Sequence, residues 1–344
     1  MSGAEHGETL LRVRGLKVHF ELKRPHIFAS PPVVHAVDGI DFEVRRGTTF
    51  GIVGESGSGK TTTALAAMRL VQATGGEILH NGIDVLKLEG EALRLHRRHM
   101  QIIFQDPYSS LNPRMRAGAI VREPLDLMDV GEPAKREDRV AELFRYVGLR
   151  PEQRALFPHQ FSGGQRQRIG IARALATQPD VIVCDEPVSA LDVAIQAQIL
   201  NLLRELQESF GLTYLFISHD LGVVQYMCDE VAVMYLGQIV EQADRVSLFR
   251  KPLHPYTWAL LSAVPSADPA LRERGERIRL AGDPPSPIDP PPGCRFASRC
   301  PFAEDRCRQE MPALRRIGEG HAVACHLVDE DGIAPHRRLA PAAQ

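Results

Sequence analysis

The sequence of 344 residues lacks three features that would place it in other protein classes. No apolar stretch approaches the ~20 residues that a membrane-spanning helix needs, and no secretory signal segment is visible at the N-terminus. The formal net charge of −2 gives no electrostatic reason to expect a nucleic-acid partner. We therefore expect a cytoplasmic protein that meets a membrane only through partner subunits and binds no nucleic acid.

Closely paired cysteines are also missing, although the chain has six cysteines. Structural zinc sites usually contain cysteines spaced roughly two to four residues apart, and a reducing compartment disfavours disulfides. Four isolated thiols in a small proline-rich tail instead favour a [4Fe-4S] cluster, with zinc, or four thiols without a metal, as the alternatives. The four candidate ligands are Cys294, Cys300, Cys307 and Cys325.

A glycine-rich loop is the strongest motif that is present. The pattern G-x-x-x-x-G-K-[ST] spans residues 54–61, between a short apolar segment (49–53) and a helix-forming stretch. Such a loop turns backbone N–H groups toward a polyanion, and the helix N-terminus adds partial positive charge. We expect Lys60 to reach the β- and γ-phosphates of ATP, Thr61 to bind Mg²⁺ and Thr62 to contact the α-phosphate. The predicted phosphate-binding residues are Gly54, Glu55, Ser56, Gly57, Ser58, Gly59, Lys60, Thr61 and Thr62.

Two carboxylates follow a second apolar run. Residues 181–184 are typical of a buried parallel strand, and Asp185 and Glu186 come directly after them. Ligands of open α/β sheets bind at the carboxyl ends of the strands. We expect Asp185 to hold Mg²⁺ and Glu186 to polarise the attacking water. The alternative, an acidic turn before Pro187, does not account for the neighbouring motifs.

With these motifs in place, the chain resembles the ATP-binding subunit of ABC transporters from about Leu11 to Val264. The segment starting at Phe161 is similar to the family's signature motif, with Phe161 where Leu is commoner. Ser162 is typical of a helix N-cap, and the glycines after it leave N–H groups open. The resemblance implies that this helix start closes over the γ-phosphate held by a second subunit. The residues concerned are Ser162, Gly163, Gly164 and Gln165.

The resemblance implies roles for three further polar residues. Gln105 is expected to reach Mg²⁺ or the attacking water and to couple that site to the membrane partner. Asp192 is expected to act at the dimer interface. His219, at the end of an apolar run, is expected to contact the γ-phosphate.

An aromatic residue near the start of the domain usually stacks on adenine in this family, and Phe20 is the candidate. Phe28 and His35 could substitute for it. Spacing alone cannot check the assignment, because stacking on a flat ring tolerates many sequences. The alternative is that Phe20 belongs to the core of an early strand.

Strand and helix patterns alternate along the chain and predict an α/β protein, a parallel-sheet nucleotide core interrupted by a helical subdomain. The resemblance implies the P-loop NTPase (RecA-like) fold with an antiparallel N-terminal sheet. We expect a nucleotide-binding domain at 8–264, its helical subdomain at about 107–178, and a Cys-containing extension at 265–335. The predicted helices are 138–147, 165–176 and 194–210, the predicted later strands are 181–184, 213–218 and 231–234, and residues 283–292 are predicted to be an extended linker.

Three segments narrow the resemblance to the ATPase subunits of oligopeptide and dipeptide importers: residues 104–113, residues 254–257 and the cysteine-bearing extension. Some members of that group carry a [4Fe-4S] cluster in this extension. The resemblance implies an ATPase that drives solute import from the cytoplasmic face of the membrane. Its partners would be a second, related but different ATPase subunit, two integral membrane permease subunits and an extracytoplasmic binding protein. The alternatives are the same machinery serving nickel or another small solute, a soluble ABC ATPase outside transport, and a redox protein.

Overall fold

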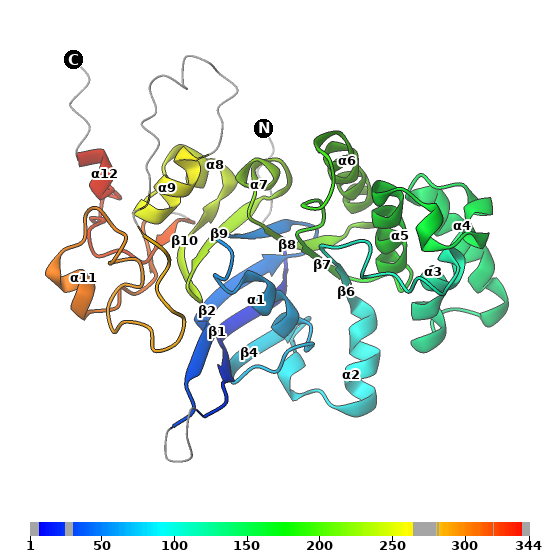
Figure 1. Ribbon diagram of the computed structural model, residues 1–344, viewed down its shortest axis with the longest axis horizontal. Coiled ribbons are helices and arrows are strands. Elements are labelled where there is room, and N and C mark those ends of the chain that lie inside the picture. The colour runs from blue at the N-terminus through cyan, green and yellow to red at the C-terminus, as the bar shows by residue number, and fades with distance from the viewer. Residues whose placement is uncertain (1–6, 25–29, 264–279, 281, 319, 339–344) are drawn as a thin grey trace. The chain divides into compact units, whose positions relative to one another are not determined.

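The computed structural model describes residues 7–24, 30–263, 280, 282–318 and 320–338, drawn in colour in Figure 1. These residues form two compact units, each assembled from several segments of the chain. Of the described residues, unit 1 contains those at 7–11, 43–49 and 79–217, and unit 2 contains those at 12–42, at 50–78 and after 217. In the described part of the chain, no helix has both the length and the apolar character needed to cross a membrane.

Unit 1 contains three parallel strands, β6 (Met100–Ile103), β7 (Val181–Asp185) and β8 (Thr213–Ser218), with β7 in the middle. Every residue of β7 and β8 is buried. Parallel strands covered on both faces form near-continuous apolar runs. The strands predicted at 181–184 and 213–218 are therefore confirmed.

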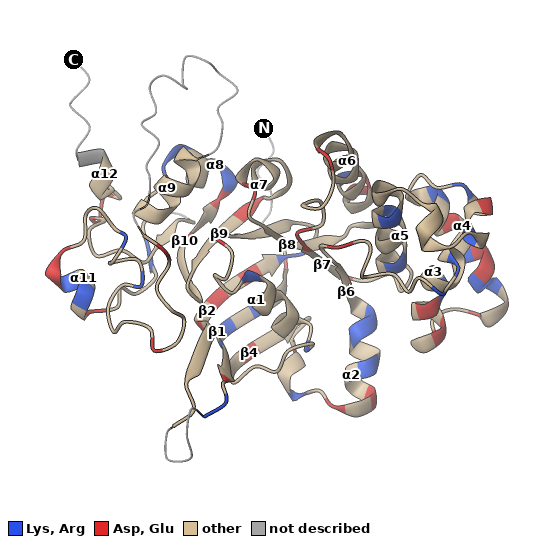
Figure 2. Cartoon of the chain, in the orientation of Figure 1, with Lys and Arg blue, Asp and Glu red and all other residues tan. Residues whose placement is uncertain are grey.

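The helical part of unit 1 lies between β6 and β7 in the sequence. The bounds expected for a helical subdomain, about 107–178, stay a prediction. Its helices are α3 (Ala117–Leu127), α4 (Arg136–Tyr146) and α5 (Gly163–Leu175), and α3 packs against both of the others. The apolar face predicted for α4 is confirmed, because its members are fully buried: Val140, Leu143, Phe144 and Val147. Acidic and basic residues alternate along α3 and α4 (Figure 2), and Arg122 pairs with Glu137 at 2.7 Å.

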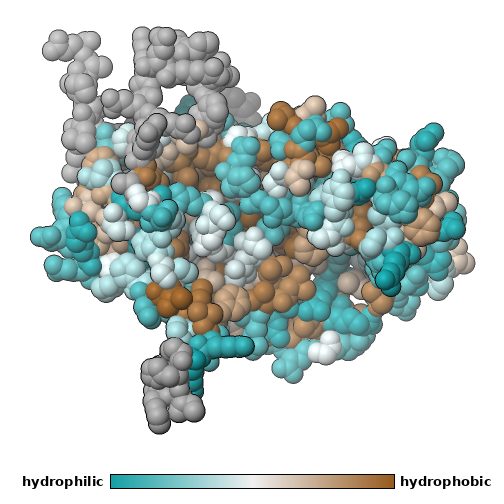
Figure 3. Space-filling view, in the orientation of Figure 1, coloured by the Kyte–Doolittle hydropathy of each residue, from teal (hydrophilic) through white to brown (hydrophobic). Residues whose placement is uncertain are grey.

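Unit 1 also contains α2 (Gly90–His96), α6 (Val193–Phe210) and a hairpin in which Leu79 and His80, the last residues of β4 (Gly75–His80), pair with β5 (Ile83–Asp84). Asn81 and Gly82 form its two-residue turn with φ of 51° and 77°. Positive φ at both positions gives the type I′ geometry that matches strand twist. In the view of Figure 3 the surface over α3–α5 is mainly hydrophilic.

Unit 2 contains β1 (Thr9–Glu21), which lies between β2 (Val33–Arg45) and β4. A second sheet contains β3 (Thr49–Val53), which is fully buried and pairs in parallel with β9 (Glu230–Tyr235). The predicted strand at 231–234 is confirmed within β9. Among the described residues, the α-helices of unit 2 are α1 (Lys60–Ala67), α7 (Leu221–Met227), α8 (Arg245–Arg250), α9 (Pro255–Ser262), α11 (Asp305–Gln309) and α12 (Pro335–Arg338).

The C-terminal tail extends this second sheet. β9 pairs antiparallel with β10 (Gln238–Asp244), β10 with β12 (Ala322–Val323), and β12 with β11 (Arg315–Arg316). The fully buried carboxylate of Glu241 on β10 accepts hydrogen bonds from the N–H groups of Leu253 and His254 and from His321 of the tail at 2.7–2.8 Å. The tail is thus continuous with the sheet of unit 2.

The predicted linker at 283–292 is confirmed as irregular chain. It contains no helix and only an isolated bridge between Val34 and Ile288. Its backbone is nevertheless fixed, since the His35 N–H donates to the carbonyl of Pro287 at 3.0 Å. The domain boundary predicted at 264/265 lies outside the described residues and stays a prediction, as does the adenine contact suggested for Phe28.

Candidate functional site

The glycine-rich loop of unit 2 has the backbone that its sequence predicts. Gly54 and Gly59 have φ of 155° and 103°, and a Cβ on either would come within 2.1 Å of a backbone carbonyl oxygen. Only glycine is compatible with such positions. The Nζ of Lys60 donates to the carbonyls of Gly54 and Glu55 at 2.9 Å each, and the residue is 5% exposed. The loop therefore wraps around the ammonium group of Lys60.

Ser58 in the same loop has an unusual environment. Its Oγ is buried and, within the described residues, has no hydrogen-bond partner. Buried polar atoms in native proteins are nearly always paired. A phosphate bound in the loop would supply the acceptor that this hydroxyl lacks, so the loop is chemically suited to a phosphorylated ligand.

Unit 1 brings Gln105 and Glu186 together. Gln105 follows β6, Glu186 follows β7, and the Gln105 Nε2 donates to the Glu186 Oε2 at 2.9 Å. Glu186 has a φ of 47°, a left-handed value that non-glycine residues rarely adopt and that often occurs at functional sites. Its N–H donates to the carbonyl of Ile217 at 3.0 Å, which holds this backbone in place. Asp185, the last residue of β7, is 7% exposed.

Helix α5 holds the segment that contains Gln105. The guanidinium of Arg166 lies 3.9 Å from the ring centroid of Tyr108, a cation–π contact. Arg173 donates from Nη1 to the carbonyl of Ser110 at 2.6 Å. The helix that begins at the signature-like segment therefore also fixes the residues after Gln105.

The start of α5 is a capping box. Ser162 Oγ accepts from the Gln165 N–H at 3.3 Å, and Gln165 Oε1 accepts from the Ser162 N–H at 3.0 Å. A Cβ on Gly164 would lie 2.5 Å from Cγ2 of Ile195 on α6. Close packing of α5 and α6 thus explains Gly164 without a ligand, a reason that the sequence alone did not provide. The predicted contact of this segment with a second nucleotide stays a prediction.

Three further predicted residues, Asp192, His219 and Phe20, lie at or near the ends of helices and strands. Asp192 is the N-cap of α6 and accepts from the Ile195 N–H at 3.0 Å. His219 directly follows β8. Phe20, near the end of β1, is 42% exposed, which excludes it from the core and leaves its ring accessible. Its stacking on adenine remains a prediction.

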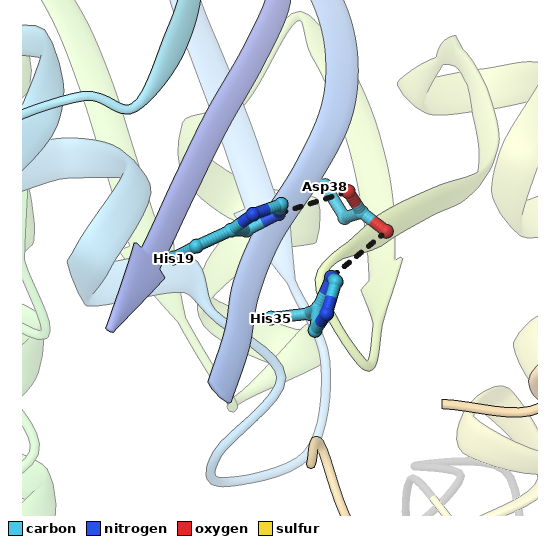
Figure 4. Close-up of side chains that lie close together, drawn as sticks. All are labelled: His19, His35 and Asp38. Atoms are coloured by element: carbon cyan, nitrogen blue, oxygen red, sulfur yellow. Dashed lines mark hydrogen bonds and ion pairs between the residues drawn. The ribbon is translucent and has the colours of Figure 1, made fainter. Parts of the chain in front are cut away.

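A charge network that the sequence did not reveal lies on β1 and β2 (Figure 4). The carboxylate of Asp38 accepts from His19 Nε2 at 3.0 Å, lies 3.6 Å from His35 Nδ1 and also pairs with the buried Arg295. Burial raises the pKa of Asp38, but the charge of Arg295 and the hydrogen bonds from His19 and Arg295 outweigh it, so the pKa is lowered. Because the guanidinium of Arg295 already pairs with the Asp38 carboxylate, His19, His35 and Asp38 fit an ion-pair network better than a metal site.

The four cysteines of the tail do meet in one pocket. Cys294, Cys300, Cys307 and Cys325 all line it, and each is a free thiol. Burial, together with a smaller effect of the neighbouring thiols, raises the pKa of Cys300 to about 12 and that of Cys325 to about 11, although backbone hydrogen bonds oppose both shifts. Metal ligation requires thiolates, so a bound cationic group would supply the charge that the pocket otherwise lacks.

The spacing of the four cysteine sulfur atoms can be compared with the spacing around a single zinc ion. Around one tetrahedral zinc, with Zn–S of about 2.3 Å, the sulfurs would lie about 3.8 Å apart. Among the described residues, only His19, His35 and Asp38 bring three candidate ligand atoms within 4.8 Å of one another. The cysteine sulfurs are therefore spread more widely than around a single zinc ion.

Residues 37–189 match the ABC transporter family, and residues 240–307 match the C-terminal region of oligopeptide/dipeptide transporters. A probable peptide ABC transporter ATP-binding protein of Sinorhizobium fredii is 50% identical over 320 residues, 93% of this chain and 90% of that protein. An oligopeptide transport ATP-binding protein of Bacillus subtilis is 48% identical over 329 residues, 94% of this chain and 99% of that protein. A solved dimeric ATP-binding cassette bound to ADP and Pi is 27% identical, with a TM-score of 0.60, and the match covers 68% of this chain and 98% of that one. The chain therefore belongs to the ABC transporter family and is one of its α/β ATPase subunits that carry the oligopeptide/dipeptide C-terminal region.

Proposed function

We propose that this chain hydrolyses ATP to drive the import of dipeptides or oligopeptides across the cytoplasmic membrane. The observation that carries the proposal is the similarity to peptide ATP-binding proteins over more than nine-tenths of the chain, tail included. Cargo selection would belong to the other subunits, because the motifs recognised in this chain concern ATP and not the transported solute. Nickel or another small solute is the alternative cargo. A non-transport ATPase would leave the C-terminal match without a purpose.

In this proposal the phosphate loop, residues 54–62, holds the triphosphate. Lys60 would exchange its two loop carbonyls for the β- and γ-phosphate oxygens, and Ser58 would gain the acceptor that it lacks. Thr61 and Asp185 would hold Mg²⁺, and Thr62 would contact the α-phosphate. The exposed ring of Phe20 is proposed to stack on adenine.

Glu186 is proposed to polarise the attacking water. The hydrogen bond from Gln105 supports this role, because it fixes the orientation of the Glu186 carboxylate. Gln105 would exchange this bond for Mg²⁺ or the water when nucleotide enters, and His219 would contact the γ-phosphate. Such an exchange would transmit the state of the nucleotide to the segment held by α5.

We propose that the working form is a dimer of ATPase subunits in which Asp192 and the capped start of α5 serve the nucleotide of the partner. The second copy is expected to be a related but different chain. Two permease subunits and an extracytoplasmic binding protein would complete the transporter, with this subunit on the cytoplasmic face. Phe104 and Tyr108, 38% and 63% exposed beside Gln105, are the apolar groups proposed to face a permease.

The cysteine pocket is proposed to hold a [4Fe-4S] cluster through Cys294, Cys300, Cys307 and Cys325. When bound, such a cluster supplies a covalent cross-link between separate stretches of the tail and a centre that can change its charge by one electron. Zinc is the alternative group, and the wide spacing of the sulfur atoms argues against it.

Transport by the reconstituted complex tests the proposed function. The subunit, its partner ATPase and two permeases would be placed in vesicles with the binding protein, and ATP-dependent uptake of a labelled dipeptide and of labelled nickel would be compared. Peptide uptake that stops with Glu186→Gln supports the proposal. Uptake of nickel alone would identify the alternative cargo, and failure to co-purify with any membrane subunit would reject transport.

A further inference from the structure

An arginine beside the cysteine pocket reaches the phosphate loop. Arg299 precedes Cys300 and forms a two-pronged ion pair with Glu55, with Nη1–Oε2 and Nη2–Oε1 distances of 2.7 and 3.2 Å. The side chain of Arg299 is 7% exposed and that of Glu55 is 28% exposed. A partly buried, bidentate pair of this kind is both strong and geometrically specific. It ties the tail to the second residue of the glycine-rich loop.

The backbone of the same loop residue is held by a buried tyrosine. The Glu55 N–H donates to the hydroxyl of Tyr256 at 2.9 Å, and Tyr256 is fully buried. Its ring contacts Tyr235 and Phe296, with centroid distances of 4.7 and 5.4 Å. Phe296 lies between Cys294 and Cys300 in the sequence and lines the cysteine pocket. The turn that carries two of the cysteines therefore contacts both the side chain and the backbone support of Glu55.

A second arginine of the tail is connected to the loop indirectly, through residues 236 and 237. Arg295, 4% exposed, donates to the carbonyl of Leu236 and pairs with Asp38. The next residue, Gly237, donates its N–H to the carbonyl of Ser58 in the loop at 2.8 Å. Residues 294–300 thus reach the phosphate loop through two independent sets of contacts.

We propose that residues 294–300 of the tail position the phosphate loop for nucleotide, and that Arg299 is the positioning residue, acting through Glu55. The physical reason is electrostatic. The carboxylate of Glu55 is in the loop that receives a polyanion, and without Arg299 its charge would repel the triphosphate and leave the loop free to turn. With Arg299 in place, the pair is neutral and the loop backbone is fixed. This inference rests on the proposed nucleotide site at residues 54–62.

Charge removal on both partners provides the sharpest test. On this proposal Arg299→Gln weakens the binding of Mg·ATP and Mg·ADP to the full-length chain by roughly tenfold, which corresponds to about 1.4 kcal/mol. The double variant Arg299→Gln/Glu55→Gln recovers most of that loss, because the unpaired carboxylate has gone. Arg299→Lys keeps the charge but not the fork, so it binds nucleotide with intermediate affinity. In the assembled transporter, KM for ATP rises with Arg299→Gln by a larger factor than kcat falls.

The matched control is Arg306→Gln. Arg306 lies in the same tail and pairs with Glu310 at 2.9 Å, but that pair is exposed and away from the loop. The Arg306→Gln variant should therefore bind nucleotide with the affinity of the wild type. Wild-type affinity of Arg299→Gln, or an equal loss in the single and double variants, would overturn the proposal. Lys60→Ala distinguishes the two levels of inference: normal nucleotide binding by Lys60→Ala rejects the phosphate-loop site itself, whereas its loss beside normal binding by Arg299→Gln rejects only the role of Arg299.

Discussion

Gln105 and Glu186 are 81 residues apart in the sequence and share a hydrogen bond of 2.9 Å. The bond connects the residues that follow two adjacent parallel strands, β6 and β7. Parallel strands bring their carboxyl ends to the same edge of a sheet, and ligands bind at that edge. The order of the strands therefore accounts for the meeting of these two distant residues.

Replacing Glu186 with Gln should abolish turnover while ATP binding persists. The amide keeps the size of the side chain and removes its capacity to take a proton, and loss of a general base lowers rates by roughly 10²–10⁴-fold. Phosphate release and equilibrium nucleotide binding measure the two effects, and size-exclusion chromatography with ATP should show a stable dimer. The control is Glu208→Gln on the exposed face of α6. Normal turnover by Glu186→Gln would remove this residue from the mechanism.

Adenine stacking on Phe20 can be measured against a neighbour of equal exposure. Phe20→Ala should weaken nucleotide binding, since stacking of a base on an aromatic ring contributes about 1–3 kcal/mol. Leu22→Ala is the control, because Leu22 is also 42% exposed but has no ring. Equal affinities of the two variants would show that adenine is held elsewhere.

Gly164→Ala should destabilise unit 1 by about 1–3 kcal/mol, because the new methyl group would lie 2.5 Å from Ile195 Cγ2. Gly170→Ala in the same helix should instead stabilise it by roughly 0.5–1 kcal/mol, because a Cβ there meets nothing within 4 Å. Urea unfolding of the two variants gives the comparison. Recovery in Gly164→Ala/Ile195→Ala would confirm the clash, and equal stability of the two single variants would contradict it.

His80 should make the fold sensitive to acid. Burial, aided by the neighbouring His96 and opposed by Asp180, lowers the pKa of His80 from 6.5 to about 4. Between these values the unfolded chain binds a proton that the folded chain excludes, so the free energy of unfolding falls as the pH drops from 6.5 toward 4. At pH 5 the loss is about 2 kcal/mol.

His80→Phe removes this titration and keeps an aromatic ring in the same place. Unfolding by urea at pH 7 and pH 5 should therefore show a smaller loss of stability for His80→Phe than for the wild type. His96, His99, Asp180 and Arg46 face the same group and are unchanged in the variant, so the comparison isolates the ring of residue 80. An identical loss in the two proteins would show that His80 is charged or solvated in the fold.

Anaerobically purified protein should be brown and contain iron and sulfide in equal amounts. Cys300→Ser should lose the colour, because the pocket then has only three thiol ligands. Cys228→Ala is the control, since Cys228 is buried against Gly51 and does not line the pocket. A colourless wild-type protein that contains zinc would reject the cluster and retain the pocket.

Local features of the fold could be predicted because their sequence signals are local. The fully buried run 181–184 and the apolar face of α4 each follow from composition and period within a few residues. The phosphate loop could likewise be recognised in the sequence, since its glycines and its lysine all lie within residues 54–60. Capping by Ser162 follows from a short motif of the same kind.

Contacts between distant segments had no such signal. Arg299 and Glu55 are 244 residues apart, and neither residue type nor spacing connects them. Arg315 and Arg316 form a strand although two consecutive arginines show no alternation of apolar and polar residues. Their conformation is set by pairing with β12. The reason for Gly164 depended on Ile195 of another helix. Each of these depends on tertiary packing that the local pattern does not encode.

The two short strands at the end of the chain have a consequence for any shortened form of this protein. Without residues beyond 310, the outer edge of β10 would lose its hydrogen-bonded neighbour and could recruit strands from other molecules. The buried Glu241 would at the same time lose its hydrogen bond with His321 and keep only those from the N–H groups of Leu253 and His254. Trimming the tail to obtain a minimal ATPase would therefore be expected to yield aggregates.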